Sequence, residues 1–154
     1  VLYRQERTAE MGETFAVYKF RSMCDGGEEF EPGEEADRVT RVGGILRQTH
    51  LDEIPQLWSI LVGDMSVVGP RAAWRNEETV LGSEGATWRQ RWFVKPGLTG
   101  LAQINDVTSE DPAKKLRYDV EYIRRQSLRY DVEIVIRQVW KVLLDAFVLI
   151  RGSR

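Results

Sequence analysis

The chain has 154 residues, 42% of them hydrophobic, five tryptophans and a formal net charge of −2. This length and composition predict a single globular domain over residues 1–154 and exclude an intrinsically disordered chain. No apolar run reaches 18 residues, so the sequence predicts no membrane-spanning helix. The only cysteine, Cys24, excludes a disulfide within the chain.

The charge is unevenly distributed along the sequence. Residues 25–37 carry seven acidic residues and neither Lys nor Arg, and their Gly and Pro content predicts a solvent-exposed loop. The rest of the chain has 17 acidic and 22 basic residues. A basic body suits an anionic ligand or an anionic membrane surface.

The N-terminal residues predict a β-hairpin. Residues 1–5 are typical of a strand, Gly12 of a turn, and the sequence FAVYKFRSM over residues 15–23 alternates with a period of two. Lys19 and Arg21 fall on the same face of the second strand as Phe15. Either the strand ends there, or the two cations point into a site.

Residues 37–49 predict a short helix that contains Gly43-Gly44. Each glycine weakens a helix by about 1 kcal/mol relative to alanine. We therefore expect another backbone or a ligand to approach this helix closely.

The sequence THLDEIPQLW, residues 49–58, predicts the start of a second helix between Leu51 and Ile54, because proline is tolerated in a first helical turn. This helix is expected to run to about Val62. Asp52 and Glu53 then lie at its positive end, either as simple caps or at an anion-binding site. The helix dipole is expected to lower the pKa of Asp52. We interpret His50 as a residue of the helix start.

Two further segments predict turns. MSVVGPR, residues 65–71, is a short apolar stretch with a Gly-Pro turn that presents Arg71. Residues 72–92 predict a helix broken at GSEG. KPGLTG, residues 95–100, predicts a tight loop, either an ordinary turn or one that directs backbone N–H groups at an anion.

The C-terminal third predicts helices over residues 112–150, with Asp111 as the first N-cap and Pro112 as the first helical residue. The last helix, residues 128–150, is apolar except for a polar stripe at every fourth residue. Its apolar surface is typical either of core packing or of a helix lying on a bilayer.

Four stretches occur in an order that resembles the bacterial sugar transferase family, the monotopic polyprenyl-phosphate phosphoglycosyl transferases. They are YKFRSM, TRVGGILRQTHLDEIPQLWSILVGDMSVVGPR, KPGLTGLAQIN and LRYDVEYI. The resemblance extends from about residue 2 to about residue 145, and the block around LDEIPQLW and GDMSVVGPR is its most specific part.

The resemblance implies an enzyme that moves a phosphosugar from a UDP-sugar to a polyprenyl phosphate and releases UMP. By the same resemblance, Asp52 would be the nucleophile of a covalent intermediate and Glu53 would help to bind Mg²⁺. It also implies a helix-dominated α+β fold with a small antiparallel hairpin. The C-terminal amphipathic helices would lie at the cytoplasmic face of the inner membrane, although this chain alone is expected to be soluble.

Six further residues match functional positions of the family and are expected to bind substrate: Lys19, Arg47, Arg71, Lys95, Gln103 and Asp119. The sequence departs from the family in several places. Lys95 replaces the usual arginine, Leu101 the usual tryptophan, and Ala72 a common proline. The hydrophobic segment by which the family enters the membrane has no counterpart before Val1, which suggests a shortened chain.

Two other functions compete with catalysis. A non-catalytic membrane-docking or assembly domain would keep the same fold, but the intact Asp-Glu pair and the nearby cations argue against it. Nucleic-acid binding ranks last, because the basic residues are scattered and do not form a stripe with aromatic platforms. The sugar, the polyprenol and the oligomeric state stay open.

Overall fold

The computed structural model describes residues 1–8, 10–24, 38–73, 85–107 and 111–152. The predicted acidic loop of residues 25–37 and most of the helix predicted over residues 72–92 lie outside these ranges. The strands are β1 (Leu2–Thr8), β2 (Thr14–Phe20), β3 (Ser66–Val68) and β4 (Gly97–Thr99). The α-helices are α1 (Arg41–Gln48), α2 (Leu57–Leu61), α4 (Gly85–Trp88), α5 (Leu101–Ile104), α6 (Pro112–Arg125) and α7 (Leu128–Gly152). The 3-10 helices are η1 (Glu10–Gly12), η3 (Leu51–Gln56) and η5 (Arg89–Phe93).

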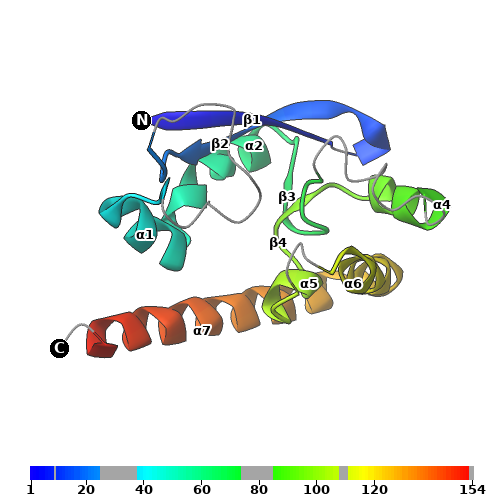
Figure 1. Cartoon of the computed structure of the whole chain (residues 1–154). Helices are drawn as coiled ribbons and strands as arrows, with labels where there is room; N and C mark the ends of the chain where they lie inside the picture. The colour runs from blue at the N-terminus through cyan, green and yellow to red at the C-terminus, as the bar shows by residue number, and fades with distance from the viewer. Residues whose placement is uncertain (9, 25–37, 74–84, 108–110, 153–154) are drawn as a thin grey trace.

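β1 and β2 form the predicted antiparallel hairpin. Their register runs from Leu2 opposite Phe20 to Thr8 opposite Thr14. β2 ends at Phe20, so Lys19 belongs to the strand, whereas Arg21 is the first residue after it. The hairpin lies along one side of the molecule, above α1 and α2 in Figure 1.

The helix predicted at Asp52-Glu53 begins at Leu51, as expected, but its first six residues form a 3-10 helix and not an α-helix. Pro55 lies inside η3, and α-helical geometry starts only at Leu57. Gly63, with a φ of 91°, follows the end of α2. The prediction of the position was right, and the prediction of a regular helix was wrong.

β3 and β4 form a parallel pair that the sequence did not predict. The expected KPGLTG loop is instead the strand β4 followed by α5, and Gly97 N–H donates to the carbonyl of Pro70 at 2.9 Å. A Cβ on Gly97 would lie 2.1 Å from the backbone nitrogen of Gly69. Gly97 therefore lets β4 approach the backbone after β3 more closely than a residue with a Cβ would allow. Ala73 is extended and bridges Thr8, so the helix predicted from residue 72 is wrong at its start.

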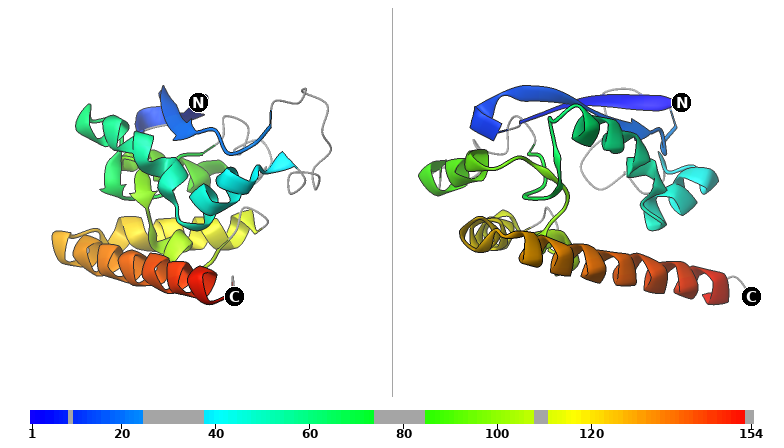
Figure 2. Two further views of the ribbon diagram at one scale, coloured as in Figure 1. Left: turned by 90° about the vertical axis from the view of Figure 1, so that its left-hand side faces the viewer. Right: turned by 180° about the vertical axis from the view of Figure 1, so that it is seen from behind.

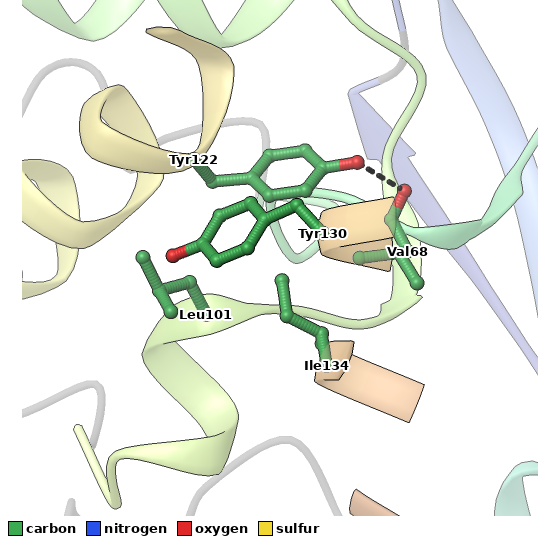
Figure 3. Close-up of a cluster of buried hydrophobic side chains, with 5 residues drawn as sticks. All are labelled: Val68, Leu101, Tyr122, Tyr130 and Ile134. Atoms are coloured by element: carbon green, nitrogen blue, oxygen red, sulfur yellow. Dashed lines mark hydrogen bonds between the residues drawn. The ribbon is translucent and has the colours of Figure 1, made fainter. Parts of the chain in front are cut away.

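α6 and α7 form the side of the molecule opposite the hairpin, as all three ribbon views show (Figures 1 and 2). Asp111 caps α6 as predicted, because its side chain accepts from the backbone N–H of Lys114 at 2.9 Å. Figure 3 shows the core between α6, α7 and the parallel pair. There Tyr122 stacks on Tyr130, and its hydroxyl donates to the carbonyl of Val68 at 3.1 Å. The fold is α+β and helix-dominated, as predicted.

Little of the apolar surface of α7 is buried in this chain. Tyr130 and Ile134 belong to the core, whereas most of the large apolar side chains after Ile134 are exposed, including Trp140 at 63%. Within the described ranges, no helix combines the length and the apolar character needed to cross a bilayer.

Candidate active site

The Asp-Glu pair belongs to η3, which begins immediately after a strained residue. His50 has a φ of 56°, in the left-handed region that residues other than glycine rarely adopt, and its carbonyl accepts from Glu53 N–H at 3.2 Å. Asp52 is 8% exposed, and the Glu53 side chain is 12% exposed. Two buried carboxylates in adjacent positions need cations or protons to offset their charge.

Glu53 receives two cations from distant parts of the chain. Lys19 of β2 places its Nζ 2.6 Å from Glu53 Oε1, and Arg71, after β3, places its Nη2 2.7 Å from the same oxygen. One carboxylate oxygen therefore joins the hairpin, η3 and the turn after β3.

These cations control the ionisation of Glu53. Burial by itself would raise the pKa of Glu53, but Arg71 and then Lys19 overcome it and lower the pKa to about 2. The pKa of Lys19 is lowered, chiefly by burial and then by Arg71, although Glu53 and Asp52 oppose that change. Glu53 is thus ionised at neutral pH and surrounded by positive charge.

Asp52 behaves differently from its neighbour. Burial raises its pKa, and the negative charge of Glu53 raises it further, while Lys19, Arg47 and His50 act in the opposite direction. The expected lowering of this pKa by a helix dipole is wrong. A 3-10 helix of six residues has a small dipole, and burial outweighs it. A carboxylate with a raised pKa is more basic, and hence more nucleophilic, once it is ionised.

Arg71 is fixed by a second, deeper ion pair. The buried Arg91 of η5 donates from Nη2 to the carbonyl oxygen of Arg71 at 2.5 Å. Its Nε lies 2.9 Å from Asp119 Oδ2, with both side chains at most 4% exposed, and its guanidinium lies 4.1 Å from the Trp88 ring centroid. Asp119 of α6 therefore fixes the backbone of Arg71 through Arg91.

The hairpin cavity, with a volume of about 670 Å³, opens beside the pair. Among the described residues, no lining side chain is Val, Leu or Ile, and six are Lys or Arg. The six cations are Arg7, Lys19, Arg21, Arg38, Arg47 and Arg71. Asp52 and Glu53 lie in the wall of this cavity. Its size and charge suit a small polyanion.

The α7 groove is a second cavity, of about 780 Å³, between η3, β4 and α7. It shares His50, Glu53 and Arg71 with the hairpin cavity, so the two meet at these residues. Eight of its described lining residues are Val, Leu or Ile: Ile54, Leu57, Val67, Leu98, Val107, Val135, Val139 and Val142. The two cavities thus differ sharply in chemical character.

The structure brings together most of the residues that were expected to form the site. Lys19, Arg47 and Arg71 line the hairpin cavity with Asp52 and Glu53, and Arg47 Nε donates to Ser22 Oγ at 2.8 Å. The other three expected residues lie elsewhere.

Gln103 lines the α7 groove, and its Nε2 donates to the Leu98 carbonyl at 3.0 Å. Lys95 lines neither cavity. Asp119 lines neither cavity; it is 2% exposed and faces Arg91, which contacts the backbone of Arg71.

Sequence reasoning missed the contribution of β1. Tyr3, Gln5 and Arg7 line the hairpin cavity, and Tyr3 lies opposite Lys19 in the hairpin register. The period of two in β1 could have placed these three side chains on one face. Arg91 gave no such signal, because its partners lie far away in the sequence.

Comparison with known proteins identifies the family of the chain. Residues 1–145 match the family model described as bacterial sugar transferase. The UDP-glucose:undecaprenyl-phosphate glucose-1-phosphate transferase of Xanthomonas campestris pv. campestris is 40% identical over 136 residues, 82% of this chain and 28% of the relative. The protein of the same name from Escherichia coli (strain K12) is 42% identical over 137 residues, 82% of this chain and 29% of the relative.

A third relative has a different sugar in its name. The UDP-N-acetylgalactosamine-undecaprenyl-phosphate N-acetylgalactosaminephosphotransferase of Aeromonas hydrophila is 36% identical over 133 residues, 82% of this chain and 31% of the relative. The chain spans less than a third of the length of these three relatives. The extent of the family match and these identities establish that the chain belongs to the bacterial sugar transferase family.

Proposed function

We propose that this chain catalyses transfer of a phosphosugar from a UDP-sugar to undecaprenyl phosphate, with release of UMP. The observation that carries the proposal is the buried Asp52 beside a glutamate that holds two cations. The names of the relatives support the same pair of substrates. We expect the donor to occupy the hairpin cavity, whose cations match a diphosphate.

The proposed reaction has two steps at one phosphorus atom. First, a carboxylate oxygen of Asp52 attacks the phosphorus that carries the sugar, and the bond from that phosphorus to the bridging oxygen breaks. The electron pair leaves with UMP, and an aspartyl phosphosugar remains. Then a phosphate oxygen of the acceptor attacks the same phosphorus, which restores the Asp52 carboxylate and forms a diphosphate linkage. We expect Lys19 and Arg71, which both contact Glu53, to offset the charge of the transferred group.

The carboxylates also fit a magnesium ion that the substrate helps to bind. Mg²⁺ is commonly held by one or two carboxylates together with substrate phosphates. The described residues contain no group of three or more His, Cys, Asp or Glu side chains that could hold a metal alone. Since Glu53 Oε1 faces both cations, Oε2 is the atom we expect to bind it. A bound Mg²⁺ would neutralise charge on the phosphates.

We also propose that α7 rests on a membrane surface. Its exposed face contains Trp140, Leu143 and Phe147, and Arg151 stacks on Phe147 with its guanidinium 4.4 Å from the ring centroid. Large apolar side chains next to a basic residue are typical of interfacial helices. An enzyme that uses a lipid-linked acceptor must meet it at such a surface.

The direct test is a phosphosugar adduct. We expect intact mass spectrometry to detect an adduct of hexose phosphate after incubation with UDP-glucose and Mg²⁺, or of N-acetylhexosamine phosphate after UDP-N-acetylgalactosamine. Asp52→Asn should lose the adduct and slow UMP release by about a thousandfold or more, because the amide is not a nucleophile. Asp64→Asn, at an exposed aspartate outside both cavities, is the matched control. An Asp52→Asn variant that releases UMP at the normal rate would exclude the covalent route.

A further inference from the structure

The α7 groove offers a separate approach to the centre of the site. It reaches Glu53 and Arg71 from the side of α7, whereas the hairpin cavity reaches them from the side of β1 and β2. The Arg71 side chain is 37% exposed, so a ligand can reach it. Two substrates that react at one centre can therefore be held in different cavities.

The lining of the groove indicates the chemistry of its ligand. The aliphatic side chains are open to solvent in this chain: Leu57 is 48% exposed, Val67 47% and Val139 51%. At the end shared with the hairpin cavity, Arg71 provides a positive charge. Farther along, Lys141 is already engaged by the Gln103 carbonyl and Asp106. A ligand that fits has an anionic head and a long aliphatic body.

We propose that the α7 groove binds the first isoprene units of the lipid phosphate acceptor, with the phosphate at Arg71 and the chain against α7. This inference rests on the proposed function for the identity of the acceptor. A nucleotide fits the groove poorly, since its base and ribose require polar partners, which the hairpin cavity supplies in greater number. The exposed face of α7 would let the rest of the chain continue into the bilayer.

The chain provides a closely matched pair of test positions on α7. Val139 lines the groove and is 51% exposed, while Val132 is 50% exposed and lies outside the groove. Both are the same residue type on the same helix. Val139→Gln and Val132→Gln therefore remove similar apolar surface, but only the first changes the groove.

The experiment measures binding without requiring the reaction. Undecaprenyl phosphate, undecaprenol and phosphatidic acid are each presented to the chain in nonionic detergent micelles, and tryptophan fluorescence reports binding. We expect undecaprenyl phosphate to bind better than the other two. Val139→Gln should weaken that binding about tenfold, as expected for the loss of one buried aliphatic side chain, and Val132→Gln should leave it unchanged. Thermal melting of both variants controls for folding.

Equal weakening by both variants would show a general attraction of α7 to micelles and overturn the proposal. So would equal binding of phosphatidic acid, which would indicate an ordinary phospholipid site, or an unaltered affinity in Val139→Gln. The adduct on Asp52 forms before any acceptor is needed. Its absence would contradict the proposed function, whereas the binding result bears on the groove alone.

Discussion

Glu53 is stabilised as an anion only while Lys19 and Arg71 stay in place. All three side chains come from different elements, and each cation contacts the same oxygen. The folded protein lowers the pKa of Glu53 from 4.5 to about 2. The ion pairs therefore contribute to folding stability above the unfolded pKa, and that contribution is lost as the pH falls from about 4.5 towards 2.

We predict that Glu53→Gln lowers the free energy of unfolding at pH 7 by about 2 kcal/mol. The lowering of the Glu53 pKa corresponds to roughly 3 kcal/mol of folding free energy, and the lowered pKa of Lys19 offsets part of this stabilisation. The difference from the unsubstituted chain should shrink between pH 4.5 and 2, as urea unfolding at several pH values can measure. Glu13→Gln, at an exposed glutamate before β2, should show no such difference. A pH-independent loss in Glu53→Gln would contradict the assignment.

At the scale of the element, one glycine lets α1 lie directly against the backbone of Ser22, two residues after the end of β2. A Cβ on Gly43 would lie 1.9 Å from the Ser22 carbonyl oxygen, which also accepts from Thr40 N–H at 3.1 Å. A Cβ on Gly44 would meet only a Val39 methyl, at 3.9 Å. The expected close approach is thus confirmed for Gly43 alone.

Gly43→Ala should destabilise the chain by about 2–3 kcal/mol, because the new methyl group collides with backbone. It should also weaken donor binding, since α1 carries Arg47 into the hairpin cavity. Gly44→Ala is the control and should stabilise the chain by up to about 1 kcal/mol through helix propensity. Chemical denaturation of both variants gives the comparison. Equal effects would mean that α1 can move away from Ser22 without cost.

The elements that the sequence predicted well are those with local signals. Alternation in residues 15–20, the Asp111 cap and the long apolar pattern of α7 each depend on neighbours within a few residues. The β3–β4 pair escaped prediction because its strands are three residues long and pair across a wide separation. Motif resemblance found Asp52, Glu53 and their cations, but no local pattern shows that Asp119 pairs with Arg91.

At the scale of the whole molecule, α7 lies on the opposite side from the hairpin (Figures 1 and 2). A chain resting on α7 would turn the hairpin away from the lipid. The α7 groove would then lie between the membrane surface and the Asp-Glu pair. Under the proposed function, this orientation would give the two substrates access from opposite sides, the water-soluble donor from the side of the hairpin and the lipid from the side of α7.

We predict that the chain co-sediments with vesicles of phosphatidylglycerol and phosphatidylethanolamine. Replacing Leu143 and Leu144 together by Gln should reduce the bound fraction severalfold, because the two side chains are 57% and 59% exposed on α7. Glu133→Gln, on the polar stripe of the same helix, should bind at least as well as the unsubstituted chain. Binding that survives the double substitution would show that another surface faces the membrane.

Arg71 borders both cavities, and this shared position has a kinetic consequence under the proposed function. One guanidinium cannot hold the donor diphosphate and the acceptor phosphate at full strength at the same time. Mutual exclusion at this cation would favour an ordered cycle in which UMP leaves before the lipid phosphate is engaged. A high surface density of acceptor would then slow the first step by competing for Arg71. The amount of acceptor in the membrane would thus control the rate at which the aspartyl phosphosugar forms.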